Sequence, residues 1–268
     1  MSGAEPLSWY VLTYNSERHL DAVLTSVREL VDDLVIVDSG SHDATRDIAA
    51  RHGARFTVRQ LDSFSTQRAF ALDLCRHPWV LCLDSDELAD AELVHGLERL
   101  KRNGFRLEQT RPDAFRVRRR WFFLNREVHA FYPIKSPDYP IRLLRKDRGG
   151  FGSGSRPVHE SPKGFASVAR MPGSIAHYSC DSVDDLYAKL DRYTALAARD
   201  LRARGVTAGW LEIYLRAVAA FVKWYVAKGG WRDGSLGWVL GRYAFDYTYR
   251  KYLKLRHDAP ATVLRGQG

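Results

Sequence analysis

Three acidic side chains stand together at the end of an apolar run. The stretch "WVLCLDSDEL", residues 79–88, begins as a buried strand would and then places Asp84, Asp86 and Glu87 close together. In an extended chain, side chains at positions i and i+2 point the same way, so Asp84 and Asp86 can approach one hard cation. Mg²⁺ or Mn²⁺ is held in this manner, by one or two carboxylates and by phosphate oxygens of the substrate. The D-x-D spacing therefore predicts a divalent-metal site that neutralises a departing diphosphate.

Hydrophobic patterns in the first hundred residues alternate between two periods. Short apolar runs predict strands at 7–13, 34–37, 55–58 and 79–83, and helical spacing or capping residues predict helices at about 20–30, 42–53, 65–76 and 90–101. Ser41 is the expected N-cap of the second helix. Strands that alternate with single helices imply a parallel sheet with helices on both faces. In such sheets, ligands bind in the crevice beyond the carboxyl ends of the strands.

Polar segments follow three of these strands. They are "TYNSE" (13–17), "DSGSHD" (38–43) and "DSDE" (84–87). Each segment alone is typical of a solvated loop with helix-capping residues. Ordinary loops, however, have no need to place Asp38, Asp84 and Asp86 on one edge of a sheet. Together the three segments predict a single ligand-binding crevice.

Length and composition exclude several classes of protein. The chain has 268 residues, 45% of them hydrophobic, which is enough for one large core or a core with an appendage. The three cysteines form no C-x-x-C pair, so neither a disulfide framework nor a zinc site is expected, and a reducing cytoplasm fits. No export signal is recognised, and no apolar run approaches the roughly 20 residues of a membrane span.

Charge is distributed unequally along the chain. Residues 1–104 carry 11 Lys and Arg against 17 Asp and Glu, whereas residues 105–268 carry 30 against 15. A basic half suggests an anionic partner: nucleic acid, anionic lipid or a phosphorylated substrate. The segments 115–123 and 142–148 mix arginine with aromatic or apolar residues, but no nucleic-acid-binding motif surrounds them. Recognition of an anionic acceptor is therefore preferred, and no nucleic-acid partner is expected.

Several of these segments resemble a known enzyme family. "VLTYNSERHLDAVLTSV", "LVIVDSGSHDATRDIAARHGA" and "WVLCLDSDE" are similar to the nucleotide-sugar-binding half of the family 2 glycosyltransferases. Within that family, "QRAFAL" and "IRLLRKDRGGFGSGSRPVHES" resemble the lipopolysaccharide-core enzymes, which add a sugar to a membrane-associated glycolipid. The match covers roughly residues 7–165 and is poor between 104 and 140. It implies an inverting transferase that uses a nucleoside-diphosphate sugar and Mg²⁺ or Mn²⁺.

The resemblance also implies a fold and a division of the chain. The expected fold is α/β: a GT-A-type, Rossmann-like central mixed sheet, mostly parallel, with helices on both faces and a C-terminal α-helical extension. The expected catalytic domain is 1–180, with a nucleotide-sugar-binding half (1–104) and an acceptor-binding half (105–180), and the extension is 181–268.

Donor-site roles carry over from the family residue by residue. In the family, the positions that border the nucleobase and ribose correspond here to Thr13, Tyr14, Asn15 and Glu17. Asp38 would accept a hydrogen bond from the base or ribose. The residues Ser39, Ser41 and Asp43 match the family's D-S-x-S-x-D loop, which lies against the nucleotide. Gln67 and Arg68 stand where the family has Gln-Lys, so Arg68 could meet the diphosphate, although an exposed helical arginine explains it equally well.

The acidic triplet and a later segment receive catalytic roles. Asp86 is the favoured metal ligand, and Asp84 is expected to contact the metal or the ribose. Glu87 would form a hydrogen bond with the donor sugar. A glutamate that begins a helix explains Glu87 nearly as well. "PVHES" resembles the family's V-H-E segment, so Glu160 is the predicted base. His159 would contact metal or acceptor; the alternative is a hydrogen-bonded loop pair of His159 and Glu160. His177 is a second candidate for the metal, although a lone histidine is more often a satisfied core residue.

The last third of the chain is helical and rich in aromatic residues. A Ser182-x-x-Asp185 capping box begins an amphipathic helix that ends at Gly205, and two further helices are expected at about 207–228 and 235–257. The segment 207–257 holds 12 of the 32 aromatic residues together with many basic ones. This composition predicts an anionic membrane surface as partner, with the protein peripheral on the inner face of the cytoplasmic membrane. A helical cap or a homo-oligomer contact is the alternative.

Two other functions fit part of the pattern. A nucleotidyltransferase also uses D-x-D, but it has a glycine-rich basic loop after its first strand, where this chain has "TYNSERH". A Rossmann oxidoreductase is disfavoured by the same lack of glycine. A non-catalytic sugar-nucleotide-binding module is the other alternative, against which the presence of Asp84, Asp86 and Glu160 weighs.

Overall fold

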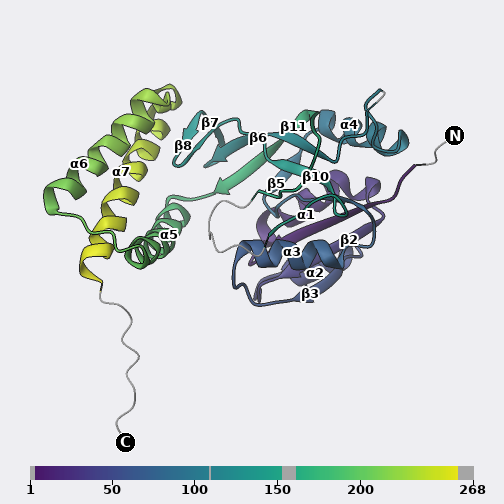
Figure 1. The fold of residues 1–268 in the computed structure, drawn as a ribbon, viewed down its shortest axis with the longest axis horizontal. Helices are drawn as coiled ribbons and strands as arrows, with labels where there is room; N and C mark the ends of the chain where they lie inside the picture. Colours follow the sequence, from purple (N-terminus) through teal and green to yellow (C-terminus); the bar gives the residue numbers. More distant parts are fainter. Residues whose placement is uncertain (1–3, 109, 153–160, 259–268) are drawn as a thin grey trace, which may run out of the picture. The chain divides into compact units, whose positions relative to one another are not determined.

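A computed structural model describes residues 4–108, 110–152 and 161–258 (Figure 1). The chain divides into two compact units. The first consists of residues 1–120 and 137–178, and the second of 121–136 and 179–268. The second unit thus includes, besides the C-terminal helices, a segment from the middle of the chain.

The central sheet of the first unit is mixed. Its strands are β1 (Leu7–Thr13), β2 (Asp33–Asp38), β3 (Arg55–Val58), β4 (Trp79–Leu81), β5 (Glu87–Ala89), β6 (Ala114–Phe123), β10 (Ile141–Arg145) and β11 (Val168–Cys180), in the order β3-β2-β1-β4-β10-β6-β11-β5. The first four in that order run parallel. Beyond them, β10 pairs antiparallel with β4 and β6, and β11 with β5. The predicted α/β fold with a mixed sheet is confirmed.

Helices cover both faces of this sheet, as predicted. They are α1 (Glu17–Val27), α2 (Thr45–Arg51), α3 (Phe64–Leu74) and α4 (Ala91–Arg102), with a 3₁₀ turn at Arg28–Leu30. Side chains alternate along a strand, so Trp9 and Val11 of β1 join the core beneath α1, α2 and α4, while Tyr10 joins the core beneath α3. All three β1 side chains are fully buried. The apolar runs of the sequence are therefore strands buried on both faces.

Two helix starts agree with local capping chemistry and one does not. Asp90 caps α4 by accepting a hydrogen bond from the Leu93 backbone N–H at 2.9 Å, and Ser63 caps α3 by accepting one from Thr66 at 3.2 Å. The expectation that Ser41 caps the second helix is wrong, because α2 begins at Thr45. The Ser41 hydroxyl instead donates to Asp38 at 2.5 Å. It serves the loop after β2 and not the helix.

The second unit is mainly helical. Its elements are α5 (Val183–Ala203), α6 (Trp210–Phe221), the π-helical segment η2 (Val222–Ala227), the 3₁₀ turn η3 (Gly230–Asp233), α7 (Gly234–His257), and the short strands β7 (Arg126–Val128), β8 (Ala130–Phe131) and β9 (Ile134–Lys135). Ser182 accepts a hydrogen bond from the Asp185 backbone N–H at 3.0 Å, which confirms the predicted cap. Leu190 of α5 and Leu240 of α7 share a buried core with Phe123. Of the helices in the described part of the chain, none has the length and apolarity needed to cross a bilayer.

Candidate active site

Hydrogen bonds tie together the loops that follow β1, β2 and β4. The Asn15 backbone N–H donates to the Ser41 hydroxyl at 2.8 Å, and the Asn15 side-chain oxygen accepts from the His42 N–H at 3.0 Å. Ser16 and Ser85 share a hydrogen bond between their hydroxyls at 3.0 Å, which joins the third loop to the first. The convergence of the three polar segments is confirmed. Their mutual bonds fix the three loops relative to one another.

Asp38 is the anchor of the second loop. Its side chain is buried, and one carboxylate oxygen accepts from Thr13 Oγ1 at 2.7 Å and from the Ser41 hydroxyl. The other oxygen accepts from the backbone N–H groups of Gly40 and Ser41, at 2.9 and 2.7 Å. Four donors thus engage both oxygens of this carboxylate. Thr13 and Asp38 thus set the loop conformation, and their contact with a nucleotide stays a prediction.

The remaining predicted donor-site residues lie around the same loops. Glu17 accepts from the Ala44 N–H at 3.0 Å, while its own N–H donates to Asp43 at 3.0 Å. Gln67, fully buried on α3, donates to the Ser39 hydroxyl at 3.4 Å. Tyr14 is 56% exposed and is the large flat side chain at this edge. The structure therefore brings the predicted donor-site residues of the first two loops and of α3 close together.

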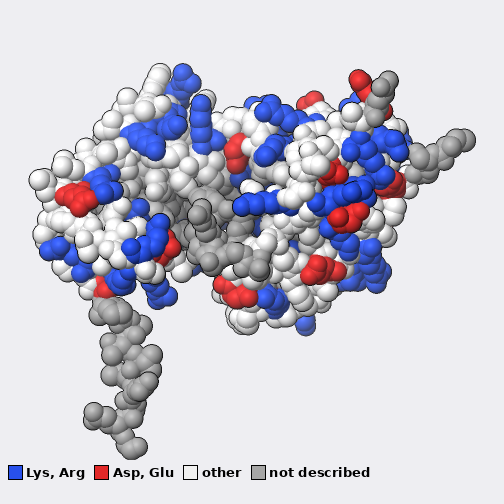
Figure 2. Space-filling model, in the orientation of Figure 1, with Lys and Arg blue, Asp and Glu red and all other residues white. Residues whose placement is uncertain are grey.

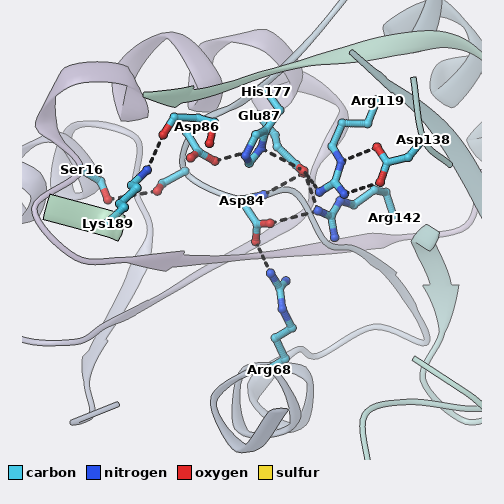
Figure 3. Close-up of polar contacts among 12 residues, drawn as sticks. Ser16, Arg68, Asp84, Asp86, Glu87, Arg119, Asp138, Arg142, His177 and Lys189 are labelled. Carbon is cyan, nitrogen blue, oxygen red and sulfur yellow. Dashed lines mark hydrogen bonds and ion pairs between the residues drawn. The ribbon is translucent and has the colours of Figure 1, made fainter. Parts of the chain in front are cut away.

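The D-x-D segment is not extended. A turn at Ser85–Asp86 follows β4, so the expectation that Asp84 and Asp86 point the same way is wrong. Asp84 instead pairs with Arg68 of α3 at 2.6 Å and with Arg142 of β10 at 3.0 Å (Figure 3). Both oxygens of Asp84 are thereby engaged by guanidinium groups. The roles of Asp84 and Asp86 as metal ligands stay predictions.

Glu87 lies at the centre of a buried ion-pair network. Its side chain is fully buried, and Oε1 accepts from Arg142 at 2.5 Å and from Arg119 of β6 at 3.0 Å. Arg119 also pairs with Asp138 at 2.6 Å. The other oxygen of Glu87 accepts from the Asp84 backbone N–H at 3.2 Å. Glu87 therefore links the D-x-D loop to β6 and β10, and its predicted contact with the donor sugar stays a prediction.

The arginines decide the charge state of these carboxylates. Burial by itself raises the pKa of Asp84, but the charges of Arg68 and Arg142 outweigh it and hold that pKa below its ordinary value. For Glu87, burial again raises the pKa, and Arg142, His177 and Arg119 hold it well below its ordinary value. Both groups are therefore anionic at neutral pH. A carboxylate with a lowered pKa is a weak base, which disfavours both groups as the proton acceptor.

His177 lies beside Asp86. It sits on β11 opposite Glu87 in β5, and its Nδ1 is 3.4 Å from Asp86 Oδ1 and 3.5 Å from Glu87 Oε1. Asp86 is 30% exposed. Two such atoms can reach one small divalent cation, with the other positions left to water and substrate phosphate. No group of three metal-ligating side chains is found in the described ranges, and the predicted metal site stays a prediction.

Residues 8–157, more than half of the chain, match the model of the family described as "Glycosyl transferase family 2". The chain belongs to glycosyltransferase family 2. The resemblance drawn from the sequence motifs is thus confirmed, and the protein is a glycosyltransferase. A nucleotidyltransferase, an oxidoreductase and a non-catalytic module are set aside.

Relatives match this glycosyltransferase over most of its length. It is 27% identical over 242 residues to the lipopolysaccharide core biosynthesis glycosyltransferase LpsC of Rhizobium meliloti, which covers 87% of this chain and 86% of LpsC. It is also 27% identical over 209 residues to an uncharacterized glycosyltransferase of Rickettsia felis, with 75% and 72% covered. Among solved structures, residues 1–349 of S. aureus TarS are 16% identical, with 93% and 90% covered and a TM-score of 0.45.

Some site residues of the glycosyltransferase were predicted from sequence and others were not. The predicted base Glu160 and its neighbour His159 lie outside the described residues, so their roles stay predictions. Sequence reasoning missed Arg119, Arg142 and Asp138 as parts of the site. Arg142 did leave a signal, because an arginine inside the apolar run "IRLLR" needs a buried carboxylate partner.

Proposed function

We propose that this glycosyltransferase transfers a sugar, with inversion at the anomeric carbon, from a nucleoside-diphosphate donor to a glycolipid or a lipopolysaccharide-core-like acceptor. The observation that carries the proposal is the set of loops at the carboxyl ends of β1, β2 and β4, which are bonded to one another and include Asp86. The similarity to LpsC supports the acceptor class.

The donor would lie across the three loops. Tyr14 offers an exposed ring to the nucleobase, and the loop anchored by Asp38 would border the ribose. Asp86 together with His177 would hold Mg²⁺ or Mn²⁺, which supplies charge neutralisation at the leaving diphosphate. Arg68 remains a candidate partner of the diphosphate, because its Nη1 is buried and has no hydrogen-bond partner in the described part of the chain.

The acceptor hydroxyl has to lose a proton as its oxygen bonds to the anomeric carbon and the nucleoside diphosphate departs. We assign that proton to Glu160, with His159 as the neighbour that orients the acceptor. Arg116 and Arg118 are exposed on β6 and suit an acceptor that carries phosphate or carboxylate groups.

Replacement of the base is expected to separate binding from chemistry. Glu160→Gln removes basicity with little change in shape, so turnover should fall by about a hundredfold or more while donor binding persists. Turnover and a donor-induced thermal shift, measured on the same preparation, check this. Asp147→Asn, at an exposed carboxylate, serves as the control and should keep native turnover. Activity of Glu160→Gln within a few-fold of native would transfer the role to His159 or to another acid.

The second unit offers a surface for the membrane that would hold such an acceptor. Leu211, Leu215, Val222 and Val226 are 73%, 55%, 48% and 55% exposed, and their spacing places them on one side of α6 and η2. We name these four residues the apolar stripe. With its basic neighbours it suits a helix lying in the interface of an anionic membrane, on the inner face of the cytoplasmic membrane. Contact between two copies of the chain is the alternative.

Polar substitutions in the apolar stripe are expected to distinguish membrane contact from contact between two copies of the chain. The double variant Leu211→Ser and Leu215→Ser should bind anionic vesicles at least about tenfold more weakly, because it loses two exposed apolar side chains, and should unfold at the native temperature. Leu196→Ser, on the exposed side of α5, is the matched control. Co-sedimentation with vesicles measures binding, and light scattering measures mass. A native dimer that the double variant dissociates, with no vesicle binding by either protein, would support the oligomer instead.

A further inference from the structure

A small cavity lies at the end of the second unit where η2 and η3 meet the β8–β9 hairpin. Its volume is about 270 Å³, and its lining includes His129, Lys135, Lys228, Trp231 and Arg232. Two segments far apart in the sequence contribute to it. The described residues of the predicted donor site lie in the other unit, so the cavity needs a separate explanation.

One buried carboxylate holds the two walls of this cavity together. The side chain of Asp233 is 3% exposed and accepts from the His129 backbone N–H at 2.9 and 3.1 Å. Its carboxylate also lies 2.6 Å from His129 Nδ1. The hairpin is thereby bonded to the turn that begins α7.

Glycines give that turn its close packing. Gly229 has φ of +81°, and a Cβ at Gly237 would stand 1.8 Å from the Gly230 carbonyl oxygen. Only glycine allows α7 to approach the turn so closely. The sequence "KGGWRDGSLG" therefore specifies a compact turn, and the cavity is formed before any ligand arrives.

The cavity carries uncompensated positive charge. Lys135, Lys228 and Arg232 are exposed, and none of them forms an ion pair with a carboxylate in the described part of the chain. The nearby acid, Asp233, is already engaged by His129. Arg232 lies over the Trp231 ring at 5.5 Å, and that ring is 56% exposed. Three cations around a preformed hollow with an aromatic edge are suited to a phosphate group.

The same hollow adjoins the apolar stripe. Val226, the last residue of the stripe, is itself part of the cavity lining. Trp238, 57% exposed, follows in the first turns of α7. Lys and Arg side chains gather over this end of the unit, at the upper left of Figure 2. A free phosphate would use only the charges, whereas a lipid brings an anionic group and apolar chains side by side.

We propose that this cavity binds the phosphate of an anionic membrane lipid while the apolar stripe enters the interfacial layer beside it. The proposal rests on the membrane contact described above and adds a defined headgroup site to it. The stripe supplies attachment to any bilayer, and the cavity supplies the preference for an anionic one.

Vesicle binding by charge variants of the full chain tests the proposal. Vesicles of phosphatidylcholine alone are compared with vesicles that also contain phosphatidylglycerol. The triple variant Lys135→Gln, Lys228→Gln and Arg232→Gln should bind the anionic vesicles at least about tenfold more weakly than native protein and should equal it on neutral ones. A matched triple, Arg192→Gln, Arg199→Gln and Arg250→Gln, removes the same charge from exposed positions of α5 and α7 and should stay within about threefold of native.

A second variant distinguishes a specific headgroup site from attraction by net positive charge alone. Asp233→Asn adds one net positive charge but loses the charged acceptor that ties His129 to the turn. If the cavity binds a lipid headgroup, Asp233→Asn should bind anionic vesicles more weakly than native protein. If only the net positive charge attracts the vesicles, the variant should bind them equally or more strongly. The second result overturns the proposal.

Three further outcomes are decisive. Inorganic phosphate that stabilises native protein but not the cavity triple, with vesicle binding equal in both, identifies a free phosphate as the occupant and overturns the lipid. If native protein binds anionic vesicles and the cavity triple binds them equally, the headgroup site is wrong while the membrane contact stands. Native protein that ignores both kinds of vesicle contradicts the membrane contact itself.

Discussion

Asp86→Ala is expected to abolish sugar transfer and to leave the fold intact. Asp86 stands at the turn after β4, is 30% exposed, and lies 3.4 Å from His177, so it is the carboxylate best placed to meet a metal-bound diphosphate. Asp84 and Glu87, by contrast, are tied to buried arginines at 2.6 and 2.5 Å. Removal of the Asp86 charge should therefore cost activity, and less stability than removal of either of those two carboxylates.

Two measurements check the Asp86 prediction. Turnover is followed with Mn²⁺ present, and thermal unfolding is followed with donor, with and without Mn²⁺, because a ligand that binds only the native state raises its stability. Native protein should show a metal-dependent shift that Asp86→Ala lacks. Asp73→Ala, at an exposed position of α3, is the matched control and should behave as native. Native turnover by Asp86→Ala would refute the assignment of Asp86 to the metal.

Arg142→Ala is expected to destabilise the first unit by about 3–5 kcal/mol, the usual cost of removing one partner from a buried ion pair. The Arg142 side chain is 8% exposed and contacts Asp84 at 3.0 Å and Glu87 at 2.5 Å. Its loss leaves Glu87, which is fully buried, with Arg119 as its remaining guanidinium partner. Denaturant unfolding at neutral pH measures the change.

A control and a pH series sharpen this prediction. Arg116→Ala removes an exposed arginine from neighbouring β6 and should change stability by less than about 0.5 kcal/mol. Folding lowers the pKa of both Asp84 and Glu87, so the stability they contribute is present at neutral pH and is lost as the pH falls through their folded values. Without Arg142 these pKa values should rise, and acid unfolding should begin at a higher pH. A cost for Arg142→Ala below about 1 kcal/mol would show that the network contributes little.

The sequence alone determined the parts of this protein that depend on neighbouring residues. The strands at 7–13 and 55–58 appear as predicted. For 7–13 the reason is its continuous apolar run, which a parallel sheet buries on both faces. The caps at Asp90 and Ser182 follow from side-chain bonds three residues along the chain. Even the convergence of the three loops was predictable, since the carboxyl ends of parallel strands share one edge of the sheet.

Tertiary structure decided the chemistry of the site. Arg142 reaches Glu87 across 55 positions of sequence, because β10 pairs antiparallel with β4, and no local pattern encodes which distant strand pairs with which. The same pairing brings Arg142 to Asp84, which also pairs with Arg68 of α3, and the spacing of D-x-D did not reveal either contact. His177 comes to Asp86 through the pairing of β11 with β5. Local periodicity specifies which side chains are buried, whereas long-range strand pairing specifies which buried charges meet.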